Sequence, residues 1–202
     1  MTVRAVIFDF GGVLARTEDR IPRTALAERF GLTYEELEAI VYGGETSLQA
    51  SRGEIPVKEH WQAVCDHLEF PPTEIRAFQR EFWGGDVIDE KLIDYIRSLP
   101  PRFKVGLLSN AWSDMRKSLQ EEWDILKLFD VVIISAEVGL IKPDPRIYQL
   151  AVEKLGVQPE EAVFVDDMRR NVEAAREAGL HAIRFTNRQE ILDQLKTLLD
   201  GD

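Results

Sequence analysis

The residues that could do chemistry in this chain stand at the ends of short apolar segments. Asp9 follows residues 3–8, and a pair of carboxylates, Asp166 and Asp167, follows residues 162–165. Ser109 and Asn110 stand at the end of a further segment, residues 104–109, and Lys142 follows another, residues 131–135. They supply a hydroxyl, an amide and an ammonium group. Three neighbouring carboxylates repel one another unless a hard cation lies among them, and Mg²⁺ suits oxygen ligands with open positions. We therefore predict a Mg²⁺ site.

The same group of residues suits an anionic substrate that carries a phosphoryl group. Lys142 supplies a positive charge, while the Ser109 hydroxyl and the Asn110 amide can donate hydrogen bonds to phosphoryl oxygens. Asp9 could attack phosphorus and form an aspartyl-phosphate, because carboxylates act as nucleophiles in some phosphoryl-transfer enzymes. The two glycines that closely follow Asp9 would let the backbone approach the metal and the phosphoryl group.

These residues meet only if the segments that carry them lie side by side. Five runs rich in apolar and β-branched residues are typical of strands buried on both faces of a parallel sheet. They are residues 3–8, 104–109, 131–135, 162–165 and 181–185. Ligands bind at the carboxyl edge of an open parallel sheet, so we expect the candidate residues to converge there.

Amphipathic helices separate the later segments. Asp144 can cap a helix with Pro145 at its first position, and Gly156 would end it. Helical patterns return at residues 171–179 and from about Gln189. The alternation predicts an α/β fold, namely a Rossmann-like doubly wound parallel sheet with right-handed crossovers.

The interval between residues 9 and 104 breaks this alternation, because it contains no convincing strand. It shows several helical patterns, one of which begins at a capping box of Thr33 and Glu36. Another helix would carry five residues on one face: Ile55, Trp61, Val64, Cys65 and Leu68. We predict a core of residues 1–15 and 86–202 and a small inserted α-helical cap of residues 16–85.

Composition excludes some classes of partner. The 202 residues carry a formal net charge of −11, so nucleic acid and anionic membranes would repel the chain. The single cysteine excludes an internal disulfide, and no apolar stretch approaches the roughly 20 residues of a membrane helix. We expect a cytoplasmic protein with no nucleic-acid or membrane partner, and the oligomeric state stays open.

Four motifs, in order along the chain, resemble those of the haloacid dehalogenase-like hydrolase superfamily. They are Phe8-Asp9-Phe10-Gly11-Gly12-Val13-Leu14, Leu108-Ser109-Asn110, Lys142-Pro143, and Phe164-Val165-Asp166-Asp167 with Asn171. The helical insertion lies where this family places its first type of cap. Within it, residues 43–45 and 52–55 resemble the cap of the bacterial glucose-1-phosphatase-like branch of sugar-phosphate phosphatases.

The resemblance implies a role for each matching residue. Asp9 becomes the nucleophile and, together with Lys142, the catalytic pair. The implied phosphate-binding residues are Ser109, Asn110 and Lys142, and the implied Mg²⁺ ligands are Asp9, the Gly11 carbonyl, Asp167 and the adjacent Asp166. Asn171 takes either a metal-side position or that of a helix N-cap.

Gly11 departs from the pattern of most phosphatases in the family. They carry a second aspartate at this position, which protonates the leaving group and later activates water. Such general acid–base catalysis typically contributes 10²–10⁴-fold. The glucose-1-phosphatase-like branch resembles this chain in lacking the acid, and Glu18 and Asp19 are the nearest candidate substitutes.

The resulting hypothesis is a Mg²⁺-dependent phosphatase that acts on a small phosphorylated metabolite, with a sugar phosphate preferred. One alternative is a catalytically weak phosphate-binding or regulatory protein that has lost its acid at Gly11. The other is a 2-haloacid dehalogenase, which uses no metal and has no need for the paired Asp166-Asp167.

Other polar and aromatic residues are expected to be structural by default. We expect His60, His67 and His181 to be structural or exposed, and Cys65 to be a core residue. Trp83, at the cap boundary, is a weaker candidate to face substrate, and so are Arg16 and Arg20 as ligands of a substrate anion.

Overall fold

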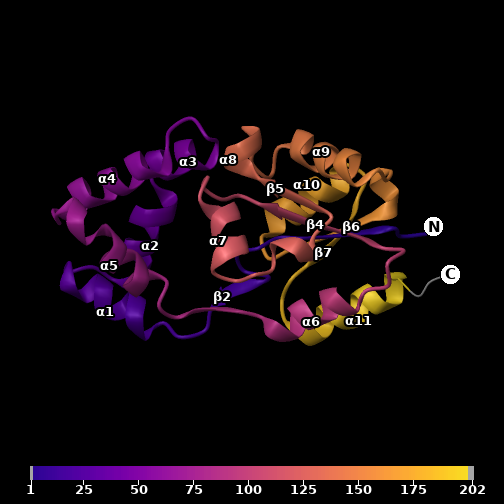
Figure 1. Cartoon of the computed structure of the whole chain (residues 1–202), viewed down its shortest axis with the longest axis horizontal. Helices are drawn as coiled ribbons and strands as arrows, with labels where there is room; N and C mark the ends of the chain where they lie inside the picture. Colours follow the sequence, from indigo (N-terminus) through magenta and orange to yellow (C-terminus); the bar gives the residue numbers. More distant parts are fainter. Residues whose placement is uncertain (1, 200–202) are drawn as a thin grey trace.

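A parallel sheet with helices on both faces forms the larger part of the computed structural model, which describes residues 2–199 (Figure 1). Its strand order is β5-β4-β1-β6-β7, and every neighbouring pair is parallel. The strands are β1 (Ala5–Phe8), β4 (Lys104–Ser109), β5 (Val131–Ile134), β6 (Ala162–Asp166) and β7 (His181–Arg184). The predicted α/β fold and all five predicted strands are confirmed.

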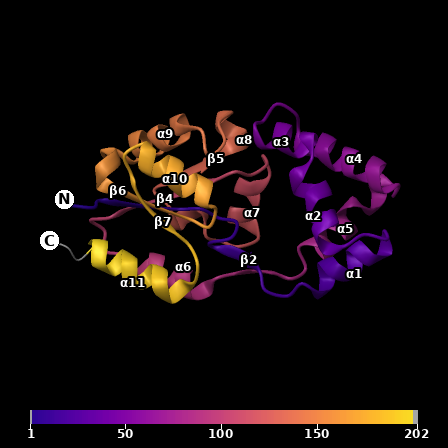
Figure 2. The same cartoon turned by 180° about the vertical axis from the view of Figure 1, so that it is seen from behind.

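Alternation of side chains along the strands builds two hydrophobic cores, one on each face of the sheet. Val6 and Phe8 of β1 belong to the core beneath α6 (Glu90–Ser98) and α11 (Arg188–Leu199). Ala5 and Ile7 point the other way. They pack in the core beneath α9 (Pro145–Leu155) and α10 (Arg169–Glu177), which cover the opposite face (Figure 2).

The local sequence signals set the limits of α9. The Asp144 side chain accepts a hydrogen bond from the Arg146 backbone N–H at 2.9 Å, and Pro145 occupies the first turn. Gly156 ends the helix at a φ of 70°. Helix α10 begins at Arg169, two residues before the expected start, because Met168 is its N-cap. Of the two roles considered for Asn171, that of helix N-cap is therefore wrong.

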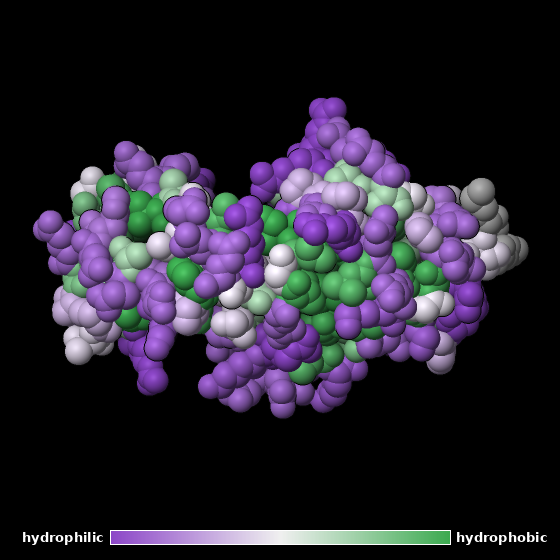
Figure 3. All heavy atoms as spheres, turned by 90° about the horizontal axis from the view of Figure 1, so that it is seen from above, coloured by the Kyte–Doolittle hydropathy of each residue, from purple (hydrophilic) through white to green (hydrophobic). Residues whose placement is uncertain are grey.

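Five helices form a separate group, which we call the helical lobe. They are α1 (Ile21–Arg29), α2 (Tyr34–Gly43), α3 (Glu45–Ser51), α4 (Val57–Leu68) and α5 (Ile75–Phe82). They pack around their own apolar cluster, which includes Leu26, Leu37 and Phe78. The capping box of Thr33 and Glu36 is present. Figure 3 shows the lobe as a distinct mass, joined to the rest by a narrower waist.

Two expectations for this interval are corrected. It contains a two-stranded antiparallel ribbon of β2 (Ala15–Thr17) and β3 (Asp86–Ile88), although no strand was expected. Three residues are too few to show a periodic pattern, and their pairing joins segments far apart in sequence. Ile55 is not part of α4, which begins at Val57, but it packs against the same apolar cluster.

Short elements complete the chain between the main strands and helices. They are α7 (Met115–Glu121), α8 (Ser135–Val138) and the 3-10 turns Pro72–Glu74, Leu126–Leu128 and Pro159–Glu161. Among the described residues, no helix has the length and apolar character needed to cross a membrane.

Candidate active site

Asp9 directly follows β1 and so lies at the carboxyl edge of the sheet. This edge faces the helical lobe (Figure 1). Its backbone N–H donates to the Val165 carbonyl at 2.9 Å, which extends the pairing between β1 and β6 by one residue. Its Oδ1 accepts a hydrogen bond from the Phe10 backbone N–H at 2.7 Å. The side chain is only 9% exposed.

Lys142 lies between two carboxylates. Its Nζ is 2.8 Å from Asp9 Oδ1 and 2.7 Å from Asp166 Oδ2. The Lys142 side chain is 1% exposed, so water screens these two ion pairs very little. The structure therefore brings together the residues expected at the ends of β1 and β6 and after β5.

Asp166 anchors the lysine. Besides Lys142, it accepts hydrogen bonds from Asn171 Nδ2 at 3.0 Å to each oxygen and from the Met168 backbone N–H at 2.8 Å. These donors occupy most of the lone pairs of a carboxylate. The Asn171 side chain thus holds Asp166. A direct metal contact by Asp166 stays a prediction, as does a metal-side role for Asn171.

Asn110 sets the position of the Lys142 backbone. Its Nδ2 donates to the Lys142 carbonyl at 2.9 Å, and its Oδ1 accepts from the Lys142 N–H at 2.8 Å. Only one side-chain N–H is left for a ligand, so the expected contact of Asn110 with substrate stays a prediction. Ser109 ends β4 and is buried, and within residues 2–199 its hydroxyl makes no hydrogen bond that would keep it from a ligand.

Gly12 allows Asp167 to reach the site. Its φ is +78°, a conformation that residues with a Cβ rarely adopt. A Cβ on Gly12 would lie 2.4 Å from both Cγ and Oδ2 of Asp167. The glycine therefore makes room for this carboxylate directly against the backbone of the first motif.

Burial and the neighbouring negative charge disfavour the ionised forms of Asp9 and Asp167. Burial raises the pKa of Asp9 to about 7; Lys142 acts in the opposite direction, and the Asp166 charge raises the pKa further. Burial, and then the charge of Asp166, also raises the pKa of Asp167. One lysine cannot balance three carboxylates in so small a volume.

The donor set fits a divalent hard cation. Asp9, Asp166 and Asp167 each place an oxygen so that the three atoms lie within 4.8 Å of one another. With all groups ionised, these carboxylates and Lys142 carry a net charge of −2. Oxygen-rich, partly open sites of this charge are typical of Mg²⁺.

We expect Asp167→Ala to weaken Mg²⁺ binding about 10–100-fold more than Asp166→Asn does. Within residues 2–199, Asp167 forms no ion pair that a metal would have to displace, whereas Asp166 is occupied by Lys142 and Asn171. Isothermal titration of both variants with Mg²⁺ gives the comparison. The opposite ranking would move the ligand assignment by one residue.

Two groups of candidate residues have structural partners: Glu18 and Asp19, considered as substitutes for the missing acid, and Arg16 and Arg20, considered as ligands of a substrate anion. Glu18 is 59% exposed and lies 3.5 Å from Arg16, while Asp19 Oδ1 accepts a hydrogen bond from the Ile21 N–H at 2.8 Å. Arg16 is held by Asp89 at 2.7 Å and Arg20 by Glu35 at 2.7 Å. Each of these four side chains has a structural contact, and their roles toward substrate stay predictions.

Ser135 was missed as a contributor to the site. Its buried Oγ accepts from the Ala111 N–H at 3.0 Å and donates to the Ala111 carbonyl at 3.1 Å, next to Asn110. It directly follows β5, so the strand-end criterion that selected Asp9 also applies to it. His60 and Cys65 are buried within the helical lobe, as expected of structural residues.

Comparison with known proteins decides the family. A family model described as haloacid dehalogenase-like hydrolase matches residues 3–179. The chain belongs to this family. The fold agrees, because a Bacteroides thetaiotaomicron HAD family enzyme, solved in complex with magnesium and inorganic phosphate, superposes with a TM-score of 0.75. That structure is 22% identical, and the match covers 94% of this chain and 98% of the other.

The curated relatives that the chain matches differ in length. The chain is 28% identical to acyl-CoA dehydrogenase family member 10 of Mus musculus over 97% of its own length, but spans only 19% of that protein. A sesquiterpene phosphatase of Aspergillus oryzae is 29% identical, with 98% of this chain and 97% of the relative covered. A phosphorylated carbohydrates phosphatase of Thermotoga maritima is also 29% identical, with 90% and 84% covered.

Proposed function

We propose that this haloacid dehalogenase-like (HAD) hydrolase is a Mg²⁺-dependent phosphatase. It would hydrolyse a small phosphorylated metabolite through an aspartyl-phosphate. The observation that carries the proposal is the buried pair of Asp9 and Lys142, 2.8 Å apart, with an oxygen of Asp167 close by and the buried Ser109 at the end of the neighbouring strand β4. Two relatives that match this chain over most of their length are named phosphatases.

In the first half-reaction, an oxygen of Asp9 forms a bond to phosphorus while the bond to the leaving-group oxygen breaks. Lys142 and the Ser109 hydroxyl bind the phosphoryl oxygens and neutralise their charge. Lys142 also holds Asp9 in a fixed orientation, and Asp166 in turn holds Lys142. In the second half-reaction, water attacks phosphorus, the bond to Asp9 breaks, and inorganic phosphate and free Asp9 are released.

Asp9, Asp167 and the Gly11 carbonyl are the residues that would hold Mg²⁺, with Asp166 behind them. The cation, when bound, would offset the negative charge of the carboxylates and of the phosphoryl oxygens. The structure supports this through the oxygen cluster described above, and through Gly12, which gives Asp167 its place beside the first motif.

We propose different roles for two parts of the chain, a core and a cap. We propose residues 1–15 and 86–202 as the hydrolase core and residues 16–85 as the cap that chooses the leaving group. The separate apolar cluster of the helical lobe supports this division, and residues 1 and 200–202 lie outside the described residues. A sugar phosphate is the preferred substrate class. The cytoplasmic location and the lack of nucleic-acid and membrane partners stay predictions.

Turnover of 4-nitrophenyl phosphate tests the proposal. The nitrophenolate leaves without protonation, so its release does not require the acid missing at Gly11. We expect phosphate release in Mg²⁺ and its loss in EDTA. Binding of phosphate without turnover would favour the alternative of a phosphate-binding or regulatory protein. Release of halide from a 2-haloacid in EDTA would favour a dehalogenase.

Gly11→Asp should raise kcat/KM for alkyl phosphates about tenfold more than for aryl phosphates. An alkoxide is a basic leaving group that needs a proton, and a tenfold change corresponds to about 1.4 kcal/mol of transition-state stabilisation. The structure leaves space, because a Cβ on Gly11 would meet nothing within 4 Å. Equal effects on both substrate classes would contradict the leaving-group explanation.

A further inference from the structure

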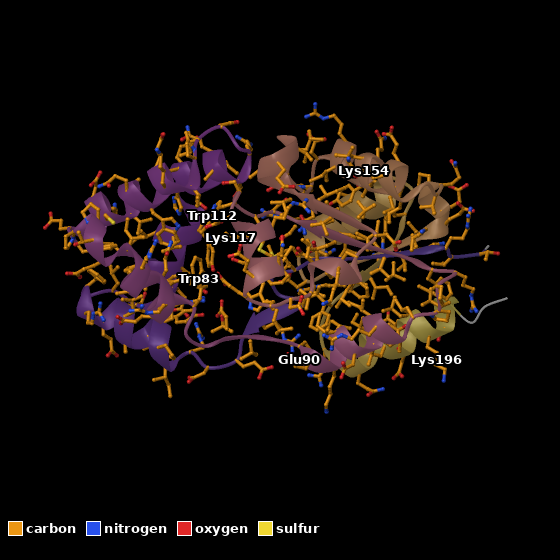
Figure 4. The ribbon with its side chains drawn as sticks, viewed as in Figure 1. Trp83, Glu90, Trp112, Lys117, Lys154 and Lys196 are labelled. Atoms are coloured by element: carbon orange, nitrogen blue, oxygen red, sulfur yellow. The ribbon has the colours of Figure 1, made fainter. Side chains whose placement is uncertain are left out.

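Trp112 belongs to a loop of the α/β part, but its side chain is buried in the helical lobe. It is 8% exposed and joins the apolar cluster of α1–α5. Its ring centroid lies 4.7 Å from that of His60, 5.5 Å from Trp61 and 5.9 Å from Tyr42. Its Nε1 donates to the Ser47 carbonyl of α3 at 3.2 Å. Figure 4 places Trp112 and Trp83 between the helical lobe and α7.

The backbone beside Trp112 is fixed to the site. Ala111 exchanges two hydrogen bonds with the Ser135 hydroxyl, and Asn110 exchanges two with the Lys142 backbone. Ser109, the proposed phosphate-binding hydroxyl, is three residues away in sequence. A shift of the Trp112 ring would therefore act on the loop that carries Ser109 and Asn110 and, through Asn110, on Lys142.

A second contact lies just past the C-terminal end of α3. Gly53, in the turn that follows α3, has a φ of +70°, and a Cβ at this position would lie 2.2 Å from the Ala136 carbonyl oxygen. Only glycine permits so close an approach of the two backbones. Ala136 follows Ser135 at the start of α8, and the Ser135 hydroxyl bonds the backbone of Ala111, the residue before Trp112. The two contacts are therefore linked through Ser135.

We infer that Trp112 and Gly53 form a joint that sets the position of the helical lobe over the phosphate-binding loops. Trp112 is a positioning residue in this joint, because its side chain extends from the core into the lobe. Gly53 allows the backbone of the lobe to contact the Ala136 carbonyl of the core. The joint fixes the distance between the proposed cap and the phosphoryl site, and thereby the size of leaving group that is accepted. This kinetic consequence rests on the proposed function, whereas the joint itself does not.

Two alanine variants of the whole chain separate the joint from ordinary backbone strain. Gly53→Ala introduces both the strain of a positive φ and the clash with Ala136. Gly31→Ala is the matched control, because Gly31 also lies in the helical lobe with a φ of +70°, but a Cβ there would meet nothing within 4 Å. The difference between the two variants reports the contact alone.

Hydrogen–deuterium exchange is the first readout, and it requires no substrate. In Gly53→Ala we expect amide exchange to rise at least about tenfold in residues 45–53, 110–112 and 135–139, with no such rise in Gly31→Ala. A tenfold rise corresponds to about 1.4 kcal/mol of easier opening. Equal exchange in these segments of both variants would overturn the joint.

The second readout is the ratio of kcat/KM for a hexose phosphate to that for acetyl phosphate. This ratio does not depend on the fraction of folded enzyme. Misplacement by about 1 Å can cost on the order of 10²-fold. We expect the ratio to change at least about tenfold in Gly53→Ala and Trp112→Ala and to stay unchanged in Gly31→Ala. In Trp112→Phe, which keeps an aromatic ring, we expect a ratio close to that of the wild type.

The outcomes distinguish the inference from the proposed function. An unchanged ratio in both Gly53→Ala and Trp112→Ala would overturn the selecting role of the joint. A wild-type enzyme that hydrolyses neither of these two substrates nor 4-nitrophenyl phosphate would overturn the proposed function, while the exchange experiment would still decide whether the joint exists. If Gly53→Ala does not fold, Trp112→Ala is compared with Trp112→Phe, both in amide exchange and in the ratio of kcat/KM values.

Discussion

Asp9→Asn should lower kcat for 4-nitrophenyl phosphate by at least about 10⁴-fold and abolish the phosphorylated enzyme. Loss of a nucleophile commonly costs this much or more, because the remaining groups bind substrate but cannot form the covalent intermediate. Asparagine has nearly the same shape, but its amide is a very poor nucleophile. Steady-state kinetics and mass spectrometry of the quenched enzyme measure the two effects.

The fold should survive this change. The asparagine oxygen can still accept the hydrogen bond that the Phe10 N–H gives to Asp9, and Lys142 keeps its ion pair with Asp166. The substitution also removes a buried carboxylate whose pKa is raised to about 7. We therefore expect the free energy of unfolding to change by no more than about 2 kcal/mol.

A matched control is Asp66→Asn on the exposed side of α4, where the asparagine oxygen can still accept the bond from Gln62. It should leave both kcat and thermal unfolding unchanged. Wild-type kcat in Asp9→Asn would contradict the assignment of the nucleophile. Loss of folding in Asp9→Asn would instead indicate that the charge of Asp9 is needed to bury Lys142.

Gly12→Ala should reduce kcat/KM by about 10²-fold and raise the Mg²⁺ concentration needed for half-maximal activity. The new Cβ would lie 2.4 Å from Asp167 Cγ, so either the carboxylate or the backbone of the first motif must move. The alanine would also have to adopt a φ of +78°. Displacements of about 1 Å in a catalytic site cost on this order.

Gly11→Ala is the control for Gly12→Ala. It changes the adjacent residue of the same motif, keeps the backbone carbonyl, and introduces a Cβ with no neighbour within 4 Å. We expect added Mg²⁺ to raise the unfolding temperature of this variant nearly as much as that of the wild type. Equal losses in both variants would show that the spacing between Gly12 and Asp167 does not matter for the metal.

Local patterns sufficed for the α/β core. The apolar runs predicted all five strands of the sheet, because a strand buried on both faces must be apolar along its whole length, whatever its neighbours are. The limits of α9 were predictable from Asp144, Pro145 and Gly156, since caps act within a few residues. The residue types at strand ends predicted Asp9, Lys142 and Asp166 as neighbours, because the ends of parallel strands share one edge.

Contacts between distant segments were decided by tertiary structure alone. The β2–β3 ribbon joins residues 15–17 to residues 86–88, and no local pattern encodes a pairing across that separation. The sequence likewise gave no sign that Asn110 would hold the Lys142 backbone, that Asn171 would hold Asp166 from within a helix, or that Trp112 would enter the helical lobe. A sequence determines which groups are present and which local conformations they favour. Which donor meets which acceptor depends on packing, because a buried polar group takes its partner from whatever the folded chain brings within hydrogen-bond distance.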